Sequence, residues 1–217
     1  MITARYNFSS PESLAQRLAI VVAASLRQAL AASSKAVLAV SGGTTPHMFF
    51  ERLSHQKLNW AQVSVTLVDE RLVDETSPRS NARLVKSTLL QNEAAVAQFV
   101  PLFQNPAAAN LADFDVVILG MGNDGHTASF FPDGDTLADT LSPSAPPVLS
   151  ISAPRSGEPR ITFSLRKILA AKEIILHIQG AGKAATLQKA LENADMLAMP
   201  VRSILHAPQA VEIYWCP

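Results

Sequence analysis

The sequence predicts an α/β protein in which helices cover both faces of a mostly parallel sheet. Short runs of branched aliphatic residues alternate with helical patterns along the whole chain, and this alternation is typical of parallel strands joined by helices. The 217 residues are enough for one substantial core and short for two, and no linker interrupts them. We therefore expect a single domain over residues 1–217.

Elements in the first half of the chain follow from local signals. Ser10 precedes Pro11, which is a typical helix start, and apolar residues then recur at helical spacing over residues 14–26. We interpret this segment as a packing helix. The further elements expected before residue 115 are strands at 36–40 and 63–68, a helix at 82–90, a short extended segment at 99–102 and a helical turn at 107–111.

The second half continues the alternation. Residues 133–147 are rich in Pro, Ser and Asp and predict a surface loop around a short helix. A helix is expected from about residue 183 to 193, with Lys183 at its head, where a cation opposes the helix dipole unless an anion is bound nearby. The strands expected in this half are residues 116–119, 148–151, 173–178 and 211–214, and the strand 148–151 leads through a loop to residues 160–165.

The most informative stretch begins at the predicted strand 116–119. Three glycines follow within six residues, so the backbone can turn sharply and approach a ligand closely. This turn contains Asp124 and His126, and an imidazole is the side chain whose unperturbed pKa lies nearest neutrality. The glycine spacing matches a dinucleotide fingerprint, but Pro132 follows soon after and residues 142–147 contain no acid for a ribose, so we exclude that reading.

A second glycine turn follows the predicted strand 36–40. It reads Ser41-Gly42-Gly43-Thr44-Thr45-Pro46, with Thr45 expected as the cap and Pro46 in the first turn of a helix. Exposed backbone N–H groups at a helix start favour a phosphate. The turn is too short for a nucleotide triphosphate loop and no Gly-Lys-Ser/Thr follows, so a monophosphate fits better.

Composition excludes several classes of function. The formal net charge is zero, which gives no electrostatic footprint for nucleic acid or an anionic membrane. No apolar run approaches the ~20 residues that span a bilayer, and the N-terminus lacks a signal-peptide pattern. The five histidines show no metal-ligand spacing, so no metal or other cofactor is expected. The single cysteine, Cys216, fits a reducing compartment, and we expect a cytoplasmic protein.

Taken together, the motifs resemble the 6-phosphogluconolactonases, in order along nearly the whole chain. Asp124 to Ser129 is the specific block, whereas the Ser41 turn is shared with glucosamine-6-phosphate deaminases. The resemblance implies a modified doubly wound fold, as in sugar-phosphate isomerases and deaminases. The segments that carry it are Ser41 to Pro46, Asp69-Glu70-Arg71, Ser80-Asn81, Gly120 to Ser129, Arg160-Ile161-Thr162 and Gly180-Ala181-Gly182-Lys183.

The resemblance implies hydrolysis of 6-phosphoglucono-1,5-lactone in the oxidative pentose phosphate pathway. The expected catalytic group is His126, which activates water, with Asp124 orienting it and Arg71 or backbone N–H groups stabilising the oxyanion. The residues expected to bind the substrate and its phosphate are Ser41, Gly42, Gly43, Thr44, Asp69, Asn81, Arg160 and Lys183. We expect the other histidines, including His177, to be surface or packing residues.

Two other functions stay open on the sequence alone. The first is an amino-sugar-phosphate deaminase or isomerase, but the resemblance implies that such enzymes carry a glutamate where this chain has Ser129-Phe130-Phe131-Pro132. The second is a non-catalytic sugar-phosphate sensor. The chain length leaves no room for the extra DNA-binding or partner domain that a sensor usually has.

Overall fold

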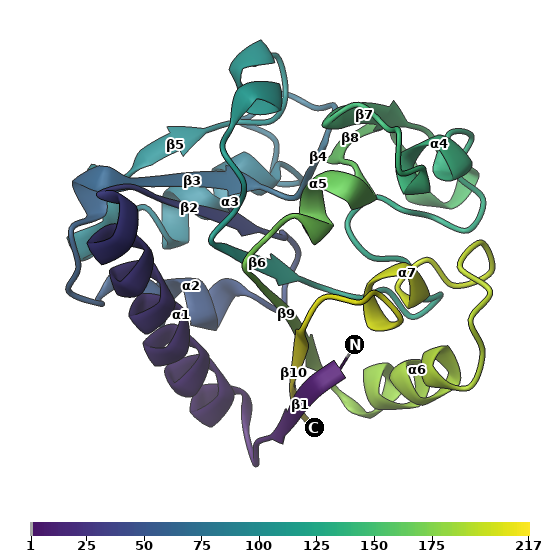
Figure 1. Cartoon of the computed structure of the whole chain (residues 1–217), viewed down its shortest axis with the longest axis horizontal. Coiled ribbons are helices and arrows are strands. Elements are labelled where there is room, and N and C mark those ends of the chain that lie inside the picture. The colour runs from purple at the N-terminus through teal and green to yellow at the C-terminus, as the bar shows by residue number, and fades with distance from the viewer. Residues whose placement is uncertain (1) are drawn as a thin grey trace.

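The computed structural model describes residues 2–217, and over these residues the strands form two sheets (Figure 1). The described strands of the larger sheet are all parallel, in the spatial order β1 (Ile2–Asn7), β10 (Val211–Cys216), β9 (Glu173–Gln179), β6 (Val116–Leu119), β2 (Ala36–Val40), β3 (Val63–Leu67) and β5 (Gln98–Val100). The smaller sheet is antiparallel, in the order β4 (Asp69–Arg71), β8 (Arg160–Phe163) and β7 (Val148–Ile151). The expected α/β fold with a mostly parallel sheet is confirmed.

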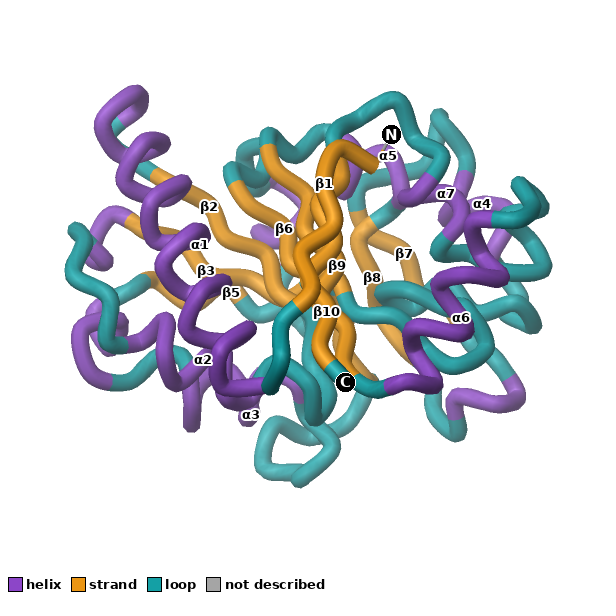
Figure 2. The backbone as a smooth tube through the Cα atoms, turned by 90° about the horizontal axis from the view of Figure 1, so that it is seen from below, coloured by secondary structure: helices purple, strands orange, loops and turns teal. Residues whose placement is uncertain are grey.

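Helices flank the large sheet on both sides, as the sequence predicts. Figure 2 shows one group of helices on one side of the sheet, and a second group together with the small sheet on the other. The first group is α1 (Pro11–Ser33), α2 (His47–Ser54) and α3 (Asn81–Thr88). The second is α4 (Leu137–Leu141), α5 (Leu165–Leu169), α6 (Ala181–Leu191) and α7 (Arg202–Leu205). Short 3-10 turns are η1 (Trp60–Gln62), η2 (Asn92–Val96), η3 (Pro106–Asn110) and η4 (Pro154–Ser156).

Helix α1 begins as predicted. The Ser10 hydroxyl accepts a hydrogen bond from the Ser13 backbone N–H, Ser13 caps back onto Ser10, and Pro11 is the first helical residue. Its apolar face packs against α2 and the large sheet as part of the core. By length and composition α1 is nevertheless long and apolar enough to cross a membrane, so the expectation of no such stretch is wrong; a buried core helix meets the same criteria.

One local prediction about a helix start is also wrong. Thr45 does not cap α2, because the helix begins at His47 with Pro46 at the cap position and no side-chain cap bond. Residues 69–71 follow the predicted strand 63–68 directly but belong to a different sheet. Strand β3 ends at Leu67, and Asp69–Arg71 form the separate strand β4, which pairs with β8. The chain therefore passes from the large sheet to the small one at Val68, whose carbonyl accepts from the Phe163 N–H.

The edge strand β1 was not predicted. It pairs in parallel with β10, so the two ends of the described chain lie side by side (Figure 1). Most of its residues are at least partly exposed, and the apolar pattern that marks a buried strand is correspondingly weak. The neighbouring strands β2, β6 and β9 are buried over most of their length, and they bring the functional loops together.

Candidate active site

A pocket of about 260 Å³ lies at the carboxyl edge of the large sheet. The neighbouring parallel strands β2, β6 and β9 end here, and the loops after them contribute most of the lining. Open α/β sheets bind their ligands at this edge. The small sheet completes the wall from β4 and β8. The lining includes ten of the residues predicted to act on a substrate: Ser41, Gly42, Gly43, Thr44, Asp69, Arg71, Asn81, His126, Arg160 and Lys183.

The remaining predicted residue, Asp124, contacts His126 instead of lining the pocket. Its Oδ1 lies 2.6 Å from Nδ1 of His126 and accepts from the His126 backbone N–H at 3.1 Å. Burial raises the pKa of Asp124, but hydrogen bonds and charge from His126 outweigh this and lower it to about 2. The carboxylate is therefore ionised near neutrality. Since an ionised carboxylate only accepts, the Nδ1 proton faces Asp124 and leaves Nε2 of the neutral ring free to take a proton.

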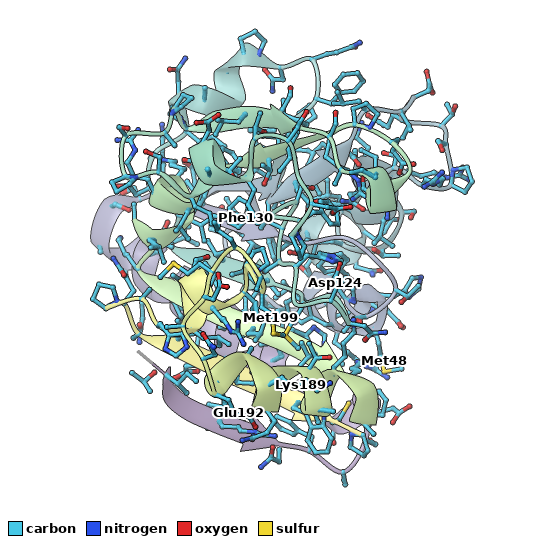
Figure 3. The ribbon with its side chains drawn as sticks, turned by 90° about the vertical axis from the view of Figure 1, so that its right-hand side faces the viewer. Met48, Asp124, Phe130, Lys189, Glu192 and Met199 are labelled. Carbon is cyan, nitrogen blue, oxygen red and sulfur yellow. The ribbon has the colours of Figure 1, made fainter. Side chains whose placement is uncertain are left out.

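One glycine leaves room for this pair, and a second allows the turn beside it. A Cβ on Gly122 would lie 2.1 Å from Nδ1 of His126 and 2.4 Å from Oδ1 of Asp124. Gly125 has a φ of +81°, and a Cβ there would come within 2.7 Å of Met199 Cε. In Figure 3, Met199 lies between Asp124 and helix α6. Turns rather than a helix follow Gly125, which agrees with the exclusion of a dinucleotide site.

The Ser41 turn packs directly against this loop. The Ser41 hydroxyl accepts from the Gly120 backbone N–H at 3.3 Å, which joins the ends of β2 and β6. Gly42 lies against Asn81, because a Cβ at Gly42 would lie 1.9 Å from Oδ1 of that side chain. Gly43 has a φ of +93°, in the left-handed region that favours glycine. The turn is thus tight and presents backbone to the pocket.

Two arginines face each other on the small sheet. Arg71 and Arg160 are paired residues in the antiparallel β4–β8 register. The Arg71 Nη1 donates to the Arg79 carbonyl at 2.5 Å and to Asn81 Oδ1 at 3.2 Å, while its Nε lies 3.1 Å from Glu158 Oε1. Arg71 is therefore held on several sides, with its second terminal nitrogen uncommitted among the described contacts.

Among the described residues Arg160, unlike Arg71, is not held by side-chain hydrogen bonds. Its side chain is 11% exposed and lies 3.7 Å from Asp69 Oδ2 and 3.9 Å from Glu158 Oε1, beyond hydrogen-bond distance. Within residues 2–217 it donates no hydrogen bond, and its Nε is fully buried. Burial lowers the pKa of Arg160, although the guanidinium stays charged near neutrality. A largely buried cation with open donors is a strong site for an anionic ligand.

Lys183 and Asp69 complete the polar lining. Lys183 lies in the first turn of α6, and burial lowers its pKa while the Asp124 carboxylate opposes that shift. Asp69 is 5% exposed and accepts a hydrogen bond from the Ser129 hydroxyl, which is fully buried. Among the described residues no group of three or more His, Cys, Asp or Glu side chains forms a metal site.

Comparisons with known proteins decide the family. The sequence model for glucosamine-6-phosphate isomerases/6-phosphogluconolactonase matches residues 9–215. A curated 6-phosphogluconolactonase from Rhizobium meliloti is 46% identical over 225 residues, covering 97% of each chain. The chain belongs to the glucosamine-6-phosphate isomerase/6-phosphogluconolactonase family.

Solved structures of the family show the same fold. A 6-phosphogluconolactonase from Shewanella baltica superposes with a TM-score of 0.94 at 39% identity, covering 99% of this chain and 98% of that one. A glucosamine-6-phosphate deaminase superposes with a TM-score of 0.81 at 18% identity, covering 99% and 97%. The second likeness concerns the fold alone, so the fold does not separate the two activities within the family.

Three residues near the pocket did not stand out in the sequence. His177, expected as a surface or packing residue, is 2% exposed on β9 and lines the pocket, and burial lowers its pKa to about 4. Glu158 forms ion pairs with Arg71, Arg79 and Arg160, and Phe131 packs against His126. Only His177 had a usable signal, because it stands just before the glycine turn that ends a predicted strand.

Proposed function

We propose that this chain hydrolyses 6-phosphoglucono-1,5-lactone to 6-phosphogluconate, a step of the oxidative pentose phosphate pathway in the cytoplasm. The main support is one juxtaposition in the pocket. His126, an imidazole with an ionised partner, and Arg160, a largely buried guanidinium without a hydrogen bond to the described residues, line the same small cavity. These are the two groups that a lactone with a remote phosphate requires, namely a base for water and a cation for the anion.

In the proposed mechanism, Nε2 of His126 takes a proton from a water molecule as its oxygen attacks the lactone carbonyl carbon. The carbonyl oxygen becomes an oxyanion, which the backbone N–H groups of the glycine turn or Arg71 stabilise. Collapse of the tetrahedral intermediate breaks the bond to the ring oxygen, and the imidazolium returns its proton to that oxygen. A well-placed general base typically contributes about 10²–10⁴-fold to such a step.

The phosphate is assigned to the cationic and backbone donors of the lining. Arg160 and Lys183 supply positive charge, and the Ser41 to Thr44 turn supplies backbone donors. Asp69 and Asn81 then contact the sugar. A volume of about 260 Å³ lies below the roughly 300–1,000 Å³ of pockets for drug-sized ligands, which suits a single phosphorylated sugar.

A deaminase or isomerase activity is less well supported. Ring opening in such an enzyme needs a second acid near the imidazole for proton transfer. In the segment where, by the family resemblance, deaminases carry that acid, this chain has Ser129, whose buried hydroxyl donates to Asp69 instead. The curated relatives of high identity carry the lactonase name. A non-catalytic sensor would not require the ionised Asp124 beside His126.

The deciding experiment compares fresh 6-phosphogluconolactone with its non-phosphorylated analogue in a pH-stat, corrected for spontaneous hydrolysis. We expect wild type to prefer the phosphorylated lactone. His126→Ala is expected to lower hydrolysis by at least about 10²-fold while binding of a phosphate ligand survives. Lys183→Ala is expected mainly to raise KM. Equal turnover by wild type and His126→Ala would contradict the catalytic assignment, and deamination of glucosamine-6-phosphate would favour the rival activity.

A further inference from the structure

One aromatic ring contacts both functional groups of the pocket. The ring centroid of Phe131 lies 4.5 Å from that of His126, with the two planes tilted by 42°. The Cζ of Arg160 lies over the same ring, 5.3 Å from its centroid. These two partners come from different sheets, because His126 follows β6 in the large sheet and Arg160 begins β8 in the small one.

Phe131 differs from its neighbour Phe130 in what surrounds it. Phe130, labelled in Figure 3, is fully buried and belongs to the main hydrophobic core. Phe131 is 4% exposed, yet among the described residues it is not part of that core cluster. The ring contacts recorded for Phe131 are with polar side chains that line the pocket. A large apolar side chain in this position therefore supports polar groups more than it fills the core.

The backbone holds Phe131 firmly. Its N–H donates to the Ser129 carbonyl at 3.1 Å, and its own carbonyl accepts from the Gly134 N–H at 3.0 Å. The Ser129 hydroxyl also donates to Asp69 on β4, so the segment is tied across to the small sheet. A Cβ on Gly134 would lie 3.1 Å from the Phe131 carbonyl oxygen, which shows how closely the chain turns here.

We propose that Phe131 is a positioning residue that sets the separation of His126 and Arg160. The inference rests on the proposed function, since that separation matters when one substrate bears its carbonyl near His126 and its phosphate near Arg160. A ring that is fixed by backbone contacts and touches both side chains limits how far either can move. It also presents its face to the guanidinium, which favours a cation there.

Phe131→Leu tests this, with Phe130→Leu as the matched control. Both substitutions remove the same atoms from a buried phenylalanine of the same segment. For Phe131→Leu we expect kcat to fall about tenfold, because the imidazole loses its support and small misplacements are costly. KM for the phosphorylated lactone and the inhibition constant of inorganic phosphate are expected to rise about fivefold, because Arg160 loses its aromatic contact.

Two readouts separate positioning from simple loss of stability. With the non-phosphorylated lactone, Phe131→Leu is expected to lower kcat similarly while KM stays within about twofold, since no phosphate meets Arg160. In proton NMR spectra of the free protein, the imidazole signals of His126 are expected to lose the ring-current shift from Phe131. Phe130→Leu is expected to leave the kinetic constants and the His126 signals unchanged, even if its unfolding midpoint falls as far as that of Phe131→Leu.

The outcomes distinguish failure of this inference from failure of the proposed function. If wild type does not hydrolyse the lactone, the proposed function is wrong, and the NMR and phosphate arms still report on the Phe131 contacts. If wild type is active but Phe131→Leu behaves like Phe130→Leu in kcat, KM and phosphate inhibition, the positioning role is refuted. An unchanged His126 resonance in Phe131→Leu refutes it as well.

Discussion

Gly122→Ala is expected to disable the enzyme although it replaces no polar side chain. The added Cβ would lie 2.1 Å from Nδ1 and 2.3 Å from Cε1 of His126, and 2.4 Å from Oδ1 of Asp124. Ordinary contact begins at 3.4 Å, so the imidazole or the carboxylate must move by about 1 Å or more. Gly122 has no positive φ, so alanine adds no backbone strain and the effect is confined to the pair.

The expected cost follows from that displacement. A misplacement of about 1 Å costs on the order of 10²-fold in rate, equivalent to about 2.7 kcal/mol of transition-state stabilisation. The loss should fall on kcat, because the residues assigned to the phosphate lie elsewhere in the lining. Steady-state hydrolysis of the phosphorylated lactone, corrected for the spontaneous reaction, measures kcat and KM separately.

Gly182→Ala is the control for glycine replacement near the site. Gly182 lies in α6, and the nearest atom to its added Cβ would be Asn123 Oδ1 at 4.0 Å. We expect its kcat to stay within about twofold of wild type, since alanine also favours the helix. If the Gly122→Ala enzyme folds normally and its kcat is within threefold of wild type, the reaction rate does not depend on the Asp124–His126 contact and the predicted role of that contact is refuted.

Three further results are expected. Asp124→Asn should lower kcat at least about tenfold in the same assay, since an amide can stabilise the wrong imidazole tautomer; an unchanged kcat would oppose this. Arg160→Lys should raise KM about tenfold for the phosphorylated lactone only, because the compact ammonium group of lysine cannot form the two parallel hydrogen bonds that a planar guanidinium makes to a phosphate. His177 has its pKa lowered from 6.5 to about 4 by burial, so the unfolded chain binds an extra proton in that window. Urea unfolding should therefore show stability falling by up to about 3 kcal/mol as the pH drops from 6.5 to 4, and His177→Phe should remove that component.

Local sequence signals predicted most elements of the fold. Ser10 and Pro11 start α1, Ser80 caps α3 through the Arg83 N–H, and the aliphatic run at Val116–Leu119 is the buried strand β6. The separate antiparallel sheet was not predicted, because three-residue strands such as Asp69–Arg71 carry no period long enough to detect. Pairing partners distant in sequence decide which sheet such a segment joins.

Some residues of the candidate site could likewise be predicted from the sequence, and others could not. Residues that follow parallel strands, such as His126 and Lys183, were predictable because the fold class itself brings those strand ends to one edge. Glu158 and Phe131 act through contacts with side chains from other segments, and a single sequence does not show those contacts. His177 was taken for a packing residue, which its burial supports, but the pocket also reaches it.

The contacts of the Arg160 side chain suggest how, under the proposed function, a chain with no net charge would attract a phosphate. Its nearest carboxylate, Asp69, is committed to the Ser129 hydroxyl and stays 3.7 Å from the guanidinium. At that distance Asp69 does not occupy the donors of the guanidinium, whereas a closer carboxylate would. Under the proposed function, an incoming phosphate would gain short charge-assisted hydrogen bonds without breaking a hydrogen bond between Arg160 and another described side chain. Because the Debye length is about 8 Å at physiological ionic strength, this local arrangement outweighs overall charge in selecting the ligand.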